Sequence, residues 1–279
     1  MARGRPPRRA LDGVRFFTGC HQPSDAHRLT AAFISIHRIA RRMSGFVVGD
    51  WIMDSGAFST ILKHGGYPQS PETYAAQIIR WSTNGNLLAA VTQDFMCEPH
   101  MLERTPARLV AERMQRRGFI PEVDRRSLIR IHQRWTIKRY DRIRRALPAE
   151  IHLMPVLQGY NPQDYVEHLA MYGGRIGAGA WVGVGSVCKR NGDPAAIEAV
   201  LLAIRNAGSD LRLRGFGVKT TALRSPMVRA LLWTADSMAW SFAARKQGRD
   251  GNSILEAIAF AERIDTTKPA ATLLSLMIA

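Results

Sequence analysis

The sequence contains few cysteines and no long hydrophobic run. Its three cysteines, Cys20, Cys97 and Cys188, lie far apart, in no CxxC pair and in no Cys/His spacing typical of a zinc site. No apolar stretch approaches the roughly 20 residues that a membrane-spanning helix needs. We therefore expect no disulfide framework, no metal centre, no cofactor and no membrane segment.

The sequence also lacks a secretory signal. Its first ten residues, MARGRPPRRA, are basic and rich in proline, and no hydrophobic core follows them. We predict that residues 1–12 form a flexible basic arm, which either touches a nucleic-acid backbone or has no role of its own. The protein is expected to act inside a cell.

Acidic residues are scarce relative to basic ones. The 279 residues include 39 Lys plus Arg against 23 Asp plus Glu, which gives a formal net charge of +16. This imbalance favours a polyanionic partner, either nucleic acid or an anionic membrane surface. Because 46% of the residues are hydrophobic, the chain can bury a substantial core, and wholesale disorder is excluded.

Short apolar runs alternate with helical patterns along the chain. The runs span residues 13–20, 47–56, 87–95, 151–159, 181–186 and 211–218, and a weaker run follows Asp236 at 237–241. The spacing of apolar residues predicts helices at 71–81, with Ser70 as the cap, at 194–207 and at 253–264. Strands that are apolar on both faces and alternate with helices indicate a parallel sheet covered on both sides.

Polar residues and glycines stand at the ends of these runs, as in Thr18-Gly19, Gln93-Asp94 and Gln158-Gly159. In a (β/α)8 barrel the catalytic groups gather on one face, at the carboxyl ends of the strands. We therefore predict an α/β fold of the TIM-barrel type, with residues 13–279 as a single domain. An open, doubly wound sheet is the alternative, because six runs are clear and the seventh is weak.

Residues 101–150 interrupt the alternation. This stretch contains fourteen Lys and Arg against six acidic residues, and its apolar residues recur at helical spacing. We predict an ordered, basic helical insertion whose charges either contact a phosphate backbone or are simply solvated. Within it, and at two later positions, we predict nucleic-acid contacts for Arg116, Arg117, Arg134, Lys138, Arg139, Arg142, Lys219 and Arg245.

Three aspartates stand where strands are expected to end: Asp54, Asp94 and Asp236. Chemistry at an anomeric carbon often uses two carboxylates, one as a nucleophile and one as a proton-transfer agent. A single aspartate at such a position more commonly caps a helix or a turn. The Gly-Val-Gly-Ser sequence at 183–186 offers backbone for the close approach of a planar ligand, or forms a tight turn.

Six segments in series resemble the 7-deazaguanine DNA transglycosylases (the DpdA family), which are relatives of tRNA-guanine transglycosylase. They are WIMDSGAFS, QDFMCEP, PVLQGYNPQDYVEHLAMYG, WVGVGSVCKR, LRLRGFGVKTTAL and ADSMAWSFAAR. The resemblance covers roughly residues 14–250. It implies a TIM barrel and the exchange of guanine in a polynucleotide for a 7-deazaguanine base, preQ0 or a derivative.

The resemblance also implies roles for individual residues. Asp236 corresponds to the covalent nucleophile, and Asp54, in DSGAF, to the residue that handles protons. The implied base-binding residues are Ser55, Asp94, Gln158, Gly159, Gly183, Val184 and Gly185. A nucleophilic aspartate would form a sugar ester, and a second base would displace it with net retention of configuration.

One departure separates the chain from the tRNA enzymes, which carry a Cys-x-Cys-x-x-Cys plus His zinc site after the nucleophile segment. Residues 237–279 contain no cysteine and no histidine, so we expect no zinc subdomain and DNA as the substrate. A tRNA-guanine transglycosylase and a non-catalytic nucleic-acid-binding barrel remain as alternatives. A helper protein for strand opening, and a phage as the source because of the Arg- and Ala-rich composition, are further expectations.

Overall fold

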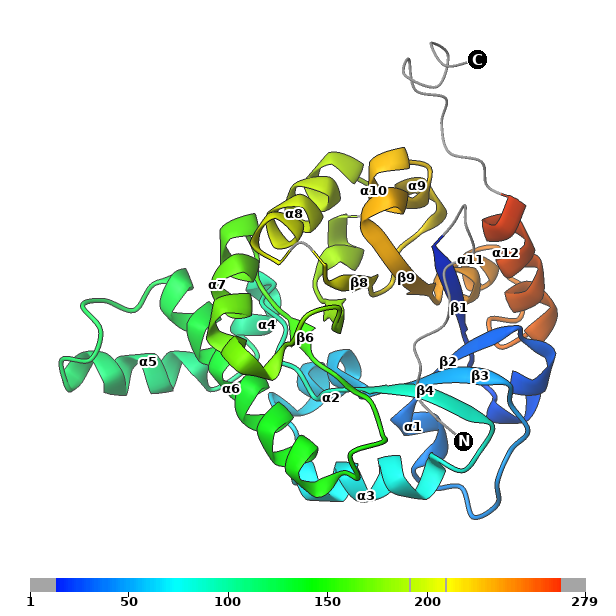
Figure 1. The fold of residues 1–279 in the computed structure, drawn as a ribbon, viewed down its shortest axis with the longest axis horizontal. Helices are drawn as coiled ribbons and strands as arrows, with labels where there is room; N and C mark the ends of the chain where they lie inside the picture. Colours follow the sequence, from blue (N-terminus) through cyan, green and yellow to red (C-terminus); the bar gives the residue numbers. More distant parts are fainter. Residues whose placement is uncertain (1–13, 191, 209, 267–279) are drawn as a thin grey trace, which may run out of the picture.

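The computed structural model describes residues 14–190, 192–208 and 210–266. The predicted basic arm, residues 1–12, lies outside the described residues. Parallel strands form a ring with helices around it (Figure 1). The sequence-based prediction of a TIM-type barrel is thereby confirmed.

The ring contains nine short strands, and every described pairing between them is parallel. Their spatial order is β5-β4-β3-β2-β1-β9-β8-β7-β6. The strands are β1 (Arg15–Gly19), β2 (Ala31–Ser35), β3 (Asp50–Asp54), β4 (Asn86–Val91), β5 (Leu153–Met154), β6 (Val156–Leu157), β7 (Trp181–Val184), β8 (Arg212–Gly215) and β9 (Leu232–Ser237).

Pro155 closes the ring. It separates β5 from β6, which pair with β4 and β7 respectively, and its carbonyl accepts a hydrogen bond from the Gly183 N–H at 2.8 Å. Because proline has no N–H, it interrupts one strand and splits it into two ladders. Counted as one, β5 and β6 join the two ends of the sheet, which gives the eight strand positions of a (β/α)8 barrel.

The helices surround this ring. They are α1 (Ile36–Ile39), α2 (Ala57–His64), α3 (Pro71–Trp81), α4 (Pro99–Leu102), α5 (Ala107–Arg116), α6 (Arg125–Ala146), α7 (Pro162–Tyr172), α8 (Pro194–Ala207), α9 (Thr220–Leu223), α10 (Pro226–Leu231), α11 (Ala239–Lys246) and α12 (Ile254–Thr266). The predicted bounds of α3 and α8 are confirmed. Ser70 caps α3 by accepting a hydrogen bond from the Thr73 N–H at 3.2 Å. Among the described residues, no helix has the length and apolar character needed to cross a bilayer.

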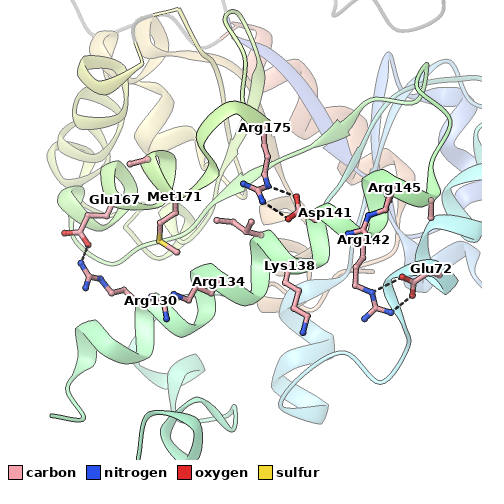
Figure 2. A pocket seen from close by; sticks show the side chains of 13 residues that line it. Glu72, Arg130, Arg134, Lys138, Asp141, Arg142, Arg145, Glu167, Met171 and Arg175 are labelled. Carbon is pink, nitrogen blue, oxygen red and sulfur yellow. Dashed lines mark hydrogen bonds and ion pairs between the residues drawn. The ribbon is translucent and has the colours of Figure 1, made fainter. Parts of the chain in front are cut away.

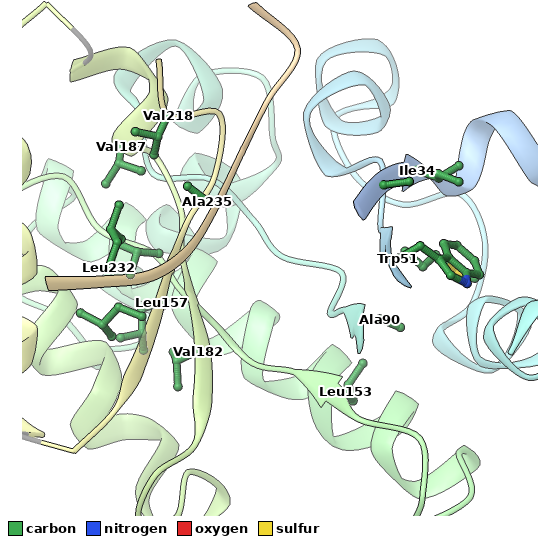
Figure 3. Close-up of a cluster of buried hydrophobic side chains, with 14 of the residues drawn as sticks. Ile34, Trp51, Ala90, Leu153, Leu157, Val182, Val187, Val218, Leu232 and Ala235 are labelled. Carbon is green, nitrogen blue, oxygen red and sulfur yellow. The ribbon is translucent and has the colours of Figure 1, made fainter. Parts of the chain in front are cut away.

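Alternating side chains of the strands build two apolar layers. One side of each strand packs against the helices, as Trp51, Leu157 and Leu232 do (Figure 3). The other side fills the barrel interior, where Phe17, Ile52 and other large side chains form a second cluster. This alternation follows the two-residue period of a strand. It places Asp54, two residues after Ile52, on the interior side at the carboxyl end of β3.

Two details of the strand prediction are wrong. The run at 237–241 is not a strand: β9 ends at Ser237, and α11 begins at Ala239. The Ser237 hydroxyl accepts the Ala239 N–H and so helps to begin the helix. The strand β9 directly follows α10 with no turn residue between them. The sequence therefore gives no signal for where β9 begins. The prediction also missed β2, a strand of only five residues.

Residues 101–150 are helical, as expected, but their two main helices differ in position. The helix α6 packs against α3 and α7 and takes its place in the ring of helices around the barrel (Figure 1). In contrast, α5 contacts α6 and projects outside that ring. The segment that projects therefore belongs to the connection between β4 and α6, on the side of the barrel where the strands end.

Candidate active site

The carboxyl ends of the strands bring three aspartates to one mouth of the barrel. Asp54 is the last residue of β3, Asp236 lies one residue before the end of β9, and Asp94 follows β4. The carboxylates interact electrostatically, with Asp54 acting on both Asp94 and Asp236. The structure therefore brings together the three aspartates that the sequence singled out.

Asp236 is buried and held by two donors. The Arg214 Nη2 donates to its Oδ1 at 2.8 Å, and the Gly217 N–H donates to its Oδ2 at 3.3 Å. Burial raises the pKa of Asp236 to about 6, while the Arg214 charge opposes this rise and the nearby Asp54 adds to it. Near neutral pH, Asp236 is therefore an oriented carboxylate, which is the form that a nucleophile needs.

Arg214 comes from β8 and is completely buried. Its guanidinium carbon lies 5.0 Å from the ring centroid of Phe17, 4.6 Å from that of Phe33 and 5.5 Å from that of Phe216. Three aromatic faces around one cation provide favourable cation–π contacts in a site that excludes water. Among the described residues, Nε and Nη1 of Arg214 find no hydrogen-bond partner.

Asp54 ends β3 at the point where α2 begins. Its Oδ2 accepts the Gly56 N–H at 3.1 Å; Gly56 has a φ of +69° and is packed against His37, where a Cβ would lie 2.3 Å from the imidazole Nε2. Burial raises the pKa of Asp54, although the Gly56 N–H, His37 and Arg214 all counteract this rise. A carboxyl with a raised pKa is suited to donate and recover a proton.

Asp94 forms a hydrogen-bonded chain with two neighbours. The Gln158 Nε2 donates to Asp94 Oδ2, and the Ser186 hydroxyl donates to Gln158 Oε1 at 2.9 Å. Burial raises the pKa of Asp94 to about 7; the Gln158 amide lowers it, and Asp54 raises it further. Ser186 has a φ of 62° and is the one residue other than glycine with a positive φ in the described part of the chain. Such a conformation is costly and occurs most often at functional sites.

The Gln158 side chain packs directly against the backbone of Gly185, where no Cβ could be accommodated. A Cβ on Gly185 would lie 2.1 Å from the Gln158 Nε2. The Gly185 carbonyl accepts the Tyr165 hydroxyl at 2.9 Å, and the Gln158 carbonyl accepts the Gln133 Nε2 at 2.8 Å. Because Gln133 and Tyr165 are buried and donate hydrogen bonds to the backbone around it, the amide of Gln158 is held in one place.

The other predicted base-binding residues lie around the same mouth, but not all point into it. Ser55 is buried, and its hydroxyl lies near the Tyr67 hydroxyl, whose pKa burial raises and Ser55 helps to lower. Gly183 lets the Phe216 ring approach, since a Cβ would meet that ring at 2.5 Å. The Val184 side chain packs in the outer apolar layer, and Gly159 packs against Asp164 and Tyr165.

The predicted nucleic-acid contacts do not form one surface. Arg134, Lys138 and Arg142 line a groove of about 1070 Å³ between α6 and α7 on the outer wall of the barrel (Figure 2). Arg142 forms a two-pronged ion pair with Glu72 there. In the described chain, no hydrogen-bond or ion-pair partner is found for Lys138 or Arg134.

The remaining predicted contacts lie elsewhere. Arg139 points away from the groove: its Nε donates to the Gln93 Oε1 at 2.8 Å, and its guanidinium lies over the Tyr67 ring. Arg116 and Arg117 stand at the end of α5, outside the ring of helices (Figure 1). Lys219 is exposed after β8, and Arg245, on α11, donates to the Ser241 hydroxyl.

The sequence prediction missed Arg214 and the aromatic residues around it. The signal was present in LRLRGFG, because alternate residues of a strand share a face. Leu213 packs outward with the helices, which places Arg214 inside the barrel. No group of three or more His, Cys, Asp or Glu side chains within the described ranges is arranged to hold a metal ion.

Comparison with known proteins identifies a relationship over nearly the whole chain. The family model described as DpdA, DeoxyPurine in DNA protein A, matches residues 13–266. This range includes all strands of the barrel and the three aspartates at its mouth. No curated protein matches the chain.

Proposed function

The chain belongs to the DpdA family, and we propose that it is a DNA base-exchange transglycosylase that replaces guanine with a 7-deazaguanine base. The incoming base is preQ0 or another 7-substituted deazaguanine. The observation that carries this proposal is the convergence of Asp236, Asp54 and Asp94 in one barrel mouth, with Arg214 holding Asp236.

In the first step, an oxygen of the Asp236 carboxylate attacks C1′ of a deoxyguanosine. The bond between C1′ and N9 breaks, and guanine leaves with a proton supplied by Asp54. The sugar is then held on the enzyme as an ester of Asp236. The raised pKa of Asp54 supports its role as the proton donor.

In the second step, the 7-deazaguanine base takes the place of guanine. Asp54 accepts the proton from N9, and N9 attacks C1′ while the bond to Asp236 breaks. Two inversions at C1′ give net retention of configuration, by the same geometric logic as a retaining glycosidase. Asp236 returns to its carboxylate form, and neither an oxidant nor a metal is consumed in this sequence.

Recognition of the base is assigned to Asp94 and Gln158, with Ser55 and the backbone of Gly183 and Gly185 beside them. An acid and an amide can match the donors and acceptors on the edge of a guanine-like base. A site built from such groups rejects bases that lack these donors and acceptors far more strongly than an apolar slot does.

The polynucleotide is held by basic side chains outside the mouth. For the reaction to occur in a duplex, the target nucleotide must leave the base stack, and its backbone must be held while it does so. Lys138, Arg134, Lys219 and the Arg116–Arg117 pair are the exposed candidates for backbone contact. A helper protein for strand opening belongs to the same proposal, as does action inside the cell, in the host cytoplasm if the gene is viral.

Nucleoside mass spectrometry tests the reaction. Purified protein is incubated with guanine-containing DNA and preQ0, and in parallel with tRNA and preQ0, and the digested nucleosides are analysed. We expect a deazaguanine deoxynucleoside with the wild-type protein and none with Asp236→Asn. Modified tRNA with unmodified DNA would mean that the substrate is tRNA. Binding of DNA without any exchange in either reaction would favour a non-catalytic barrel.

A further inference from the structure

Arg214 is an unusual residue for the inside of a barrel. It is completely buried, and the described residues provide only one hydrogen-bonding side chain for it, the carboxylate of Asp236 at 2.8 Å. Its Nε and Nη1 have no partner in the described part of the protein. Burying a guanidinium with two unpaired groups is costly, and apolar residues of similar size are often at least as stable. Stability alone therefore gives no reason for an arginine here.

The surroundings of Arg214 fix its position. The rings of Phe17, Phe33 and Phe216 each lie within 5.5 Å of its guanidinium carbon, measured to the ring centroid. A long side chain enclosed by three rings has little freedom to swing out to solvent. The cation thus remains in the mouth whatever the state of the groups around it.

Two carboxylates share this one cation. Arg214 is hydrogen-bonded to Asp236 at 2.8 Å, and Asp54, on the interior side at the end of β3, is near enough to interact electrostatically with both. Like charges at short range in a buried site cannot both ionise easily, and a single cation balances only one of them. The three groups together therefore favour one negative carboxylate and one protonated carboxyl.

We propose that Arg214 is the shared counterion of Asp236 and Asp54, so that the proton on Asp54 follows the covalent state of Asp236. This inference rests on the proposed function and adds a positioning residue to it. In the free enzyme, the hydrogen bond from Arg214 selects Asp236 as the carboxylate, and Asp54 carries the proton. The free enzyme thus has an ionised nucleophile, Asp236, and a protonated general acid, Asp54.

Formation of the ester reverses this arrangement. When an oxygen of Asp236 bonds to C1′, the bond from C1′ to N9 breaks and its electron pair goes to guanine, which takes the Asp54 proton. Asp236 is then a neutral ester, and Asp54 is the carboxylate that balances Arg214. The net charge of the three groups is zero before and after the step.

The second half of the reaction restores the first state. The incoming base gives its N9 proton to the Asp54 carboxylate, and N9 bonds to C1′ as the ester bond to Asp236 breaks. The electron pair of that bond returns to Asp236, which again pairs with Arg214. One buried cation thus makes Asp54 an acid in one half-reaction and a base in the other.

Other groups also face these carboxyls. Asp54 interacts with His37 from α1, with Asp94 after β4 and with Tyr67 and Tyr74, and the Gly56 N–H donates to it. Asp236 meets the Gly217 N–H. Arg214 is the cation common to both carboxyls, and its removal is therefore expected to affect both.

The test is the pH dependence of the first half-reaction, measured as guanine released in a single turnover without an incoming base. The rate requires Asp236 ionised and Asp54 protonated, so it rises and then falls with pH. Without Arg214, both carboxyls lose a cation that lowers their pKa values. In Arg214→Gln and Arg214→Met, the rising and the falling limb of the pH–rate profile should both move to higher pH, by on the order of one to three units. In Arg214→Lys, which restores a cation, both limbs should move back toward their wild-type positions.

The matched control is Arg212→Gln. Arg212 precedes Arg214 by two residues on β8 and lies over the Trp233 ring, so the control removes the same type of side chain from the same strand. Its limbs should coincide with those of the wild type. Thermal melting identifies any variant that has lost its fold. Because Arg214→Gln is polar and Arg214→Met is apolar, the measurement can be made with one of them if the other does not fold.

Proton balance provides a measurement on the wild-type protein alone. At the pH optimum of guanine release, the shared-counterion arrangement predicts no net proton uptake from solvent, because Asp54 supplies the proton. Uptake of one proton per guanine released would contradict it, as would limbs that stay in place in the Arg214 variants or activity that does not return at higher pH. If the wild type releases no guanine and exchanges no base, the proposed function itself fails.

Discussion

The two sides of the barrel mouth use their polar groups differently. On the side of β3, β8 and β9, the titratable groups Asp54 and Asp236 lie near Arg214, whose guanidinium is surrounded by aromatic rings and is partly unpaired. On the side of β4, β6 and β7, Asp94, Gln158 and Ser186 form a continuous hydrogen-bonded chain. We interpret the first side as the site of bond making and the second as the site of base recognition.

The difference has a physical basis. Charge that is buried and incompletely paired can respond when a bond forms beside it, because little solvent screens the change. A fully paired chain of side chains instead keeps its geometry, and geometry is what distinguishes one base edge from another. The comparison therefore predicts that substitutions on one side remove the chemistry, whereas substitutions on the other alter which base is accepted.

Asp236→Asn should have the largest effect. An amide cannot form the sugar ester, so we expect base exchange to fall by at least about 10⁴-fold, as when other enzymes lose a covalent nucleophile. Nucleoside mass spectrometry measures the loss. The control is Asp250→Asn, the same change at an exposed residue, which should leave exchange intact. Substantial exchange by the Asp236 variant would place the nucleophile elsewhere.

Asp94→Asn should weaken recognition of the base and make the protein more stable than the wild type at alkaline pH. We expect kcat/KM for guanine exchange to fall roughly 10²-fold, since hydrogen bonds to charged groups contribute about 1.5–3 kcal/mol. Burial raises the pKa of Asp94 to about 7, so the folded state holds its proton more tightly than the unfolded state does. Ionisation therefore costs stability as the pH rises from about 4 to 7.

Melting curves of Asp94→Asn at two pH values test the sign of this effect. The variant should gain on the order of 1–4 kcal/mol over wild type at pH 8, where wild-type Asp94 is ionised, and little at pH 4. A variant that is less stable than wild type at pH 8 would mean that the Asp94 carboxylate is well compensated in the fold. A change in kcat alone, with unchanged preference among bases, would move Asp94 out of the recognition side.

Gly185→Ala should produce an intermediate effect. The added Cβ would lie 2.1 Å from the Gln158 Nε2, so the amide must shift away from Asp94. We expect KM for the incoming base to rise by about 10-fold or more with a smaller change in kcat, because one or two hydrogen bonds are lost. Gly177→Ala, at a glycine with open space around it, is the control. Equal behaviour of the two variants would show that the Gln158 position is unimportant.

Lys138→Ala should have the smallest effect. Lys138 lines the groove between α6 and α7 without a paired acid among the described residues, whereas the neighbouring Arg142 is paired with Glu72. Each lost phosphate contact should reduce the slope of log affinity against log salt by about one. We expect this for Lys138→Ala and less for Arg142→Ala, as measured by DNA binding at several salt concentrations. Unchanged slopes in both would remove the groove from the DNA path.

The sequence was sufficient to predict the barrel and the convergence of its aspartates, because both depend on local patterns. Apolar runs separated by helices predict parallel strands, and polar residues at the ends of those strands must meet at one face. It was not sufficient to predict β2, since five residues beside a short helix carry little periodic signal. Nor did it reveal that Pro155 divides the closing strand into two ladders.

The direction in which individual side chains point was the main feature that the sequence did not predict. An arginine in an apolar strand is ordinarily expected to reach solvent, and only the alternation with Leu213 indicates that Arg214 points inward. The basic stretch shows the same difficulty. Lys138 and Arg139 are adjacent in sequence, yet about 100° of helical rotation separates them. As a result, Lys138 lines the outer groove while Arg139 holds Gln93.

The most direct test of the account is to locate the sugar on the enzyme. Wild-type protein is mixed with guanine-containing DNA in the absence of an incoming base, denatured in acid within a single turnover and digested with pepsin. Mass spectrometry then identifies the peptide that carries the DNA. We predict an ester on Asp236, with none in Asp236→Asn. Adduct on Asp54 would reverse the assigned roles, and exchange without any adduct would contradict the covalent mechanism.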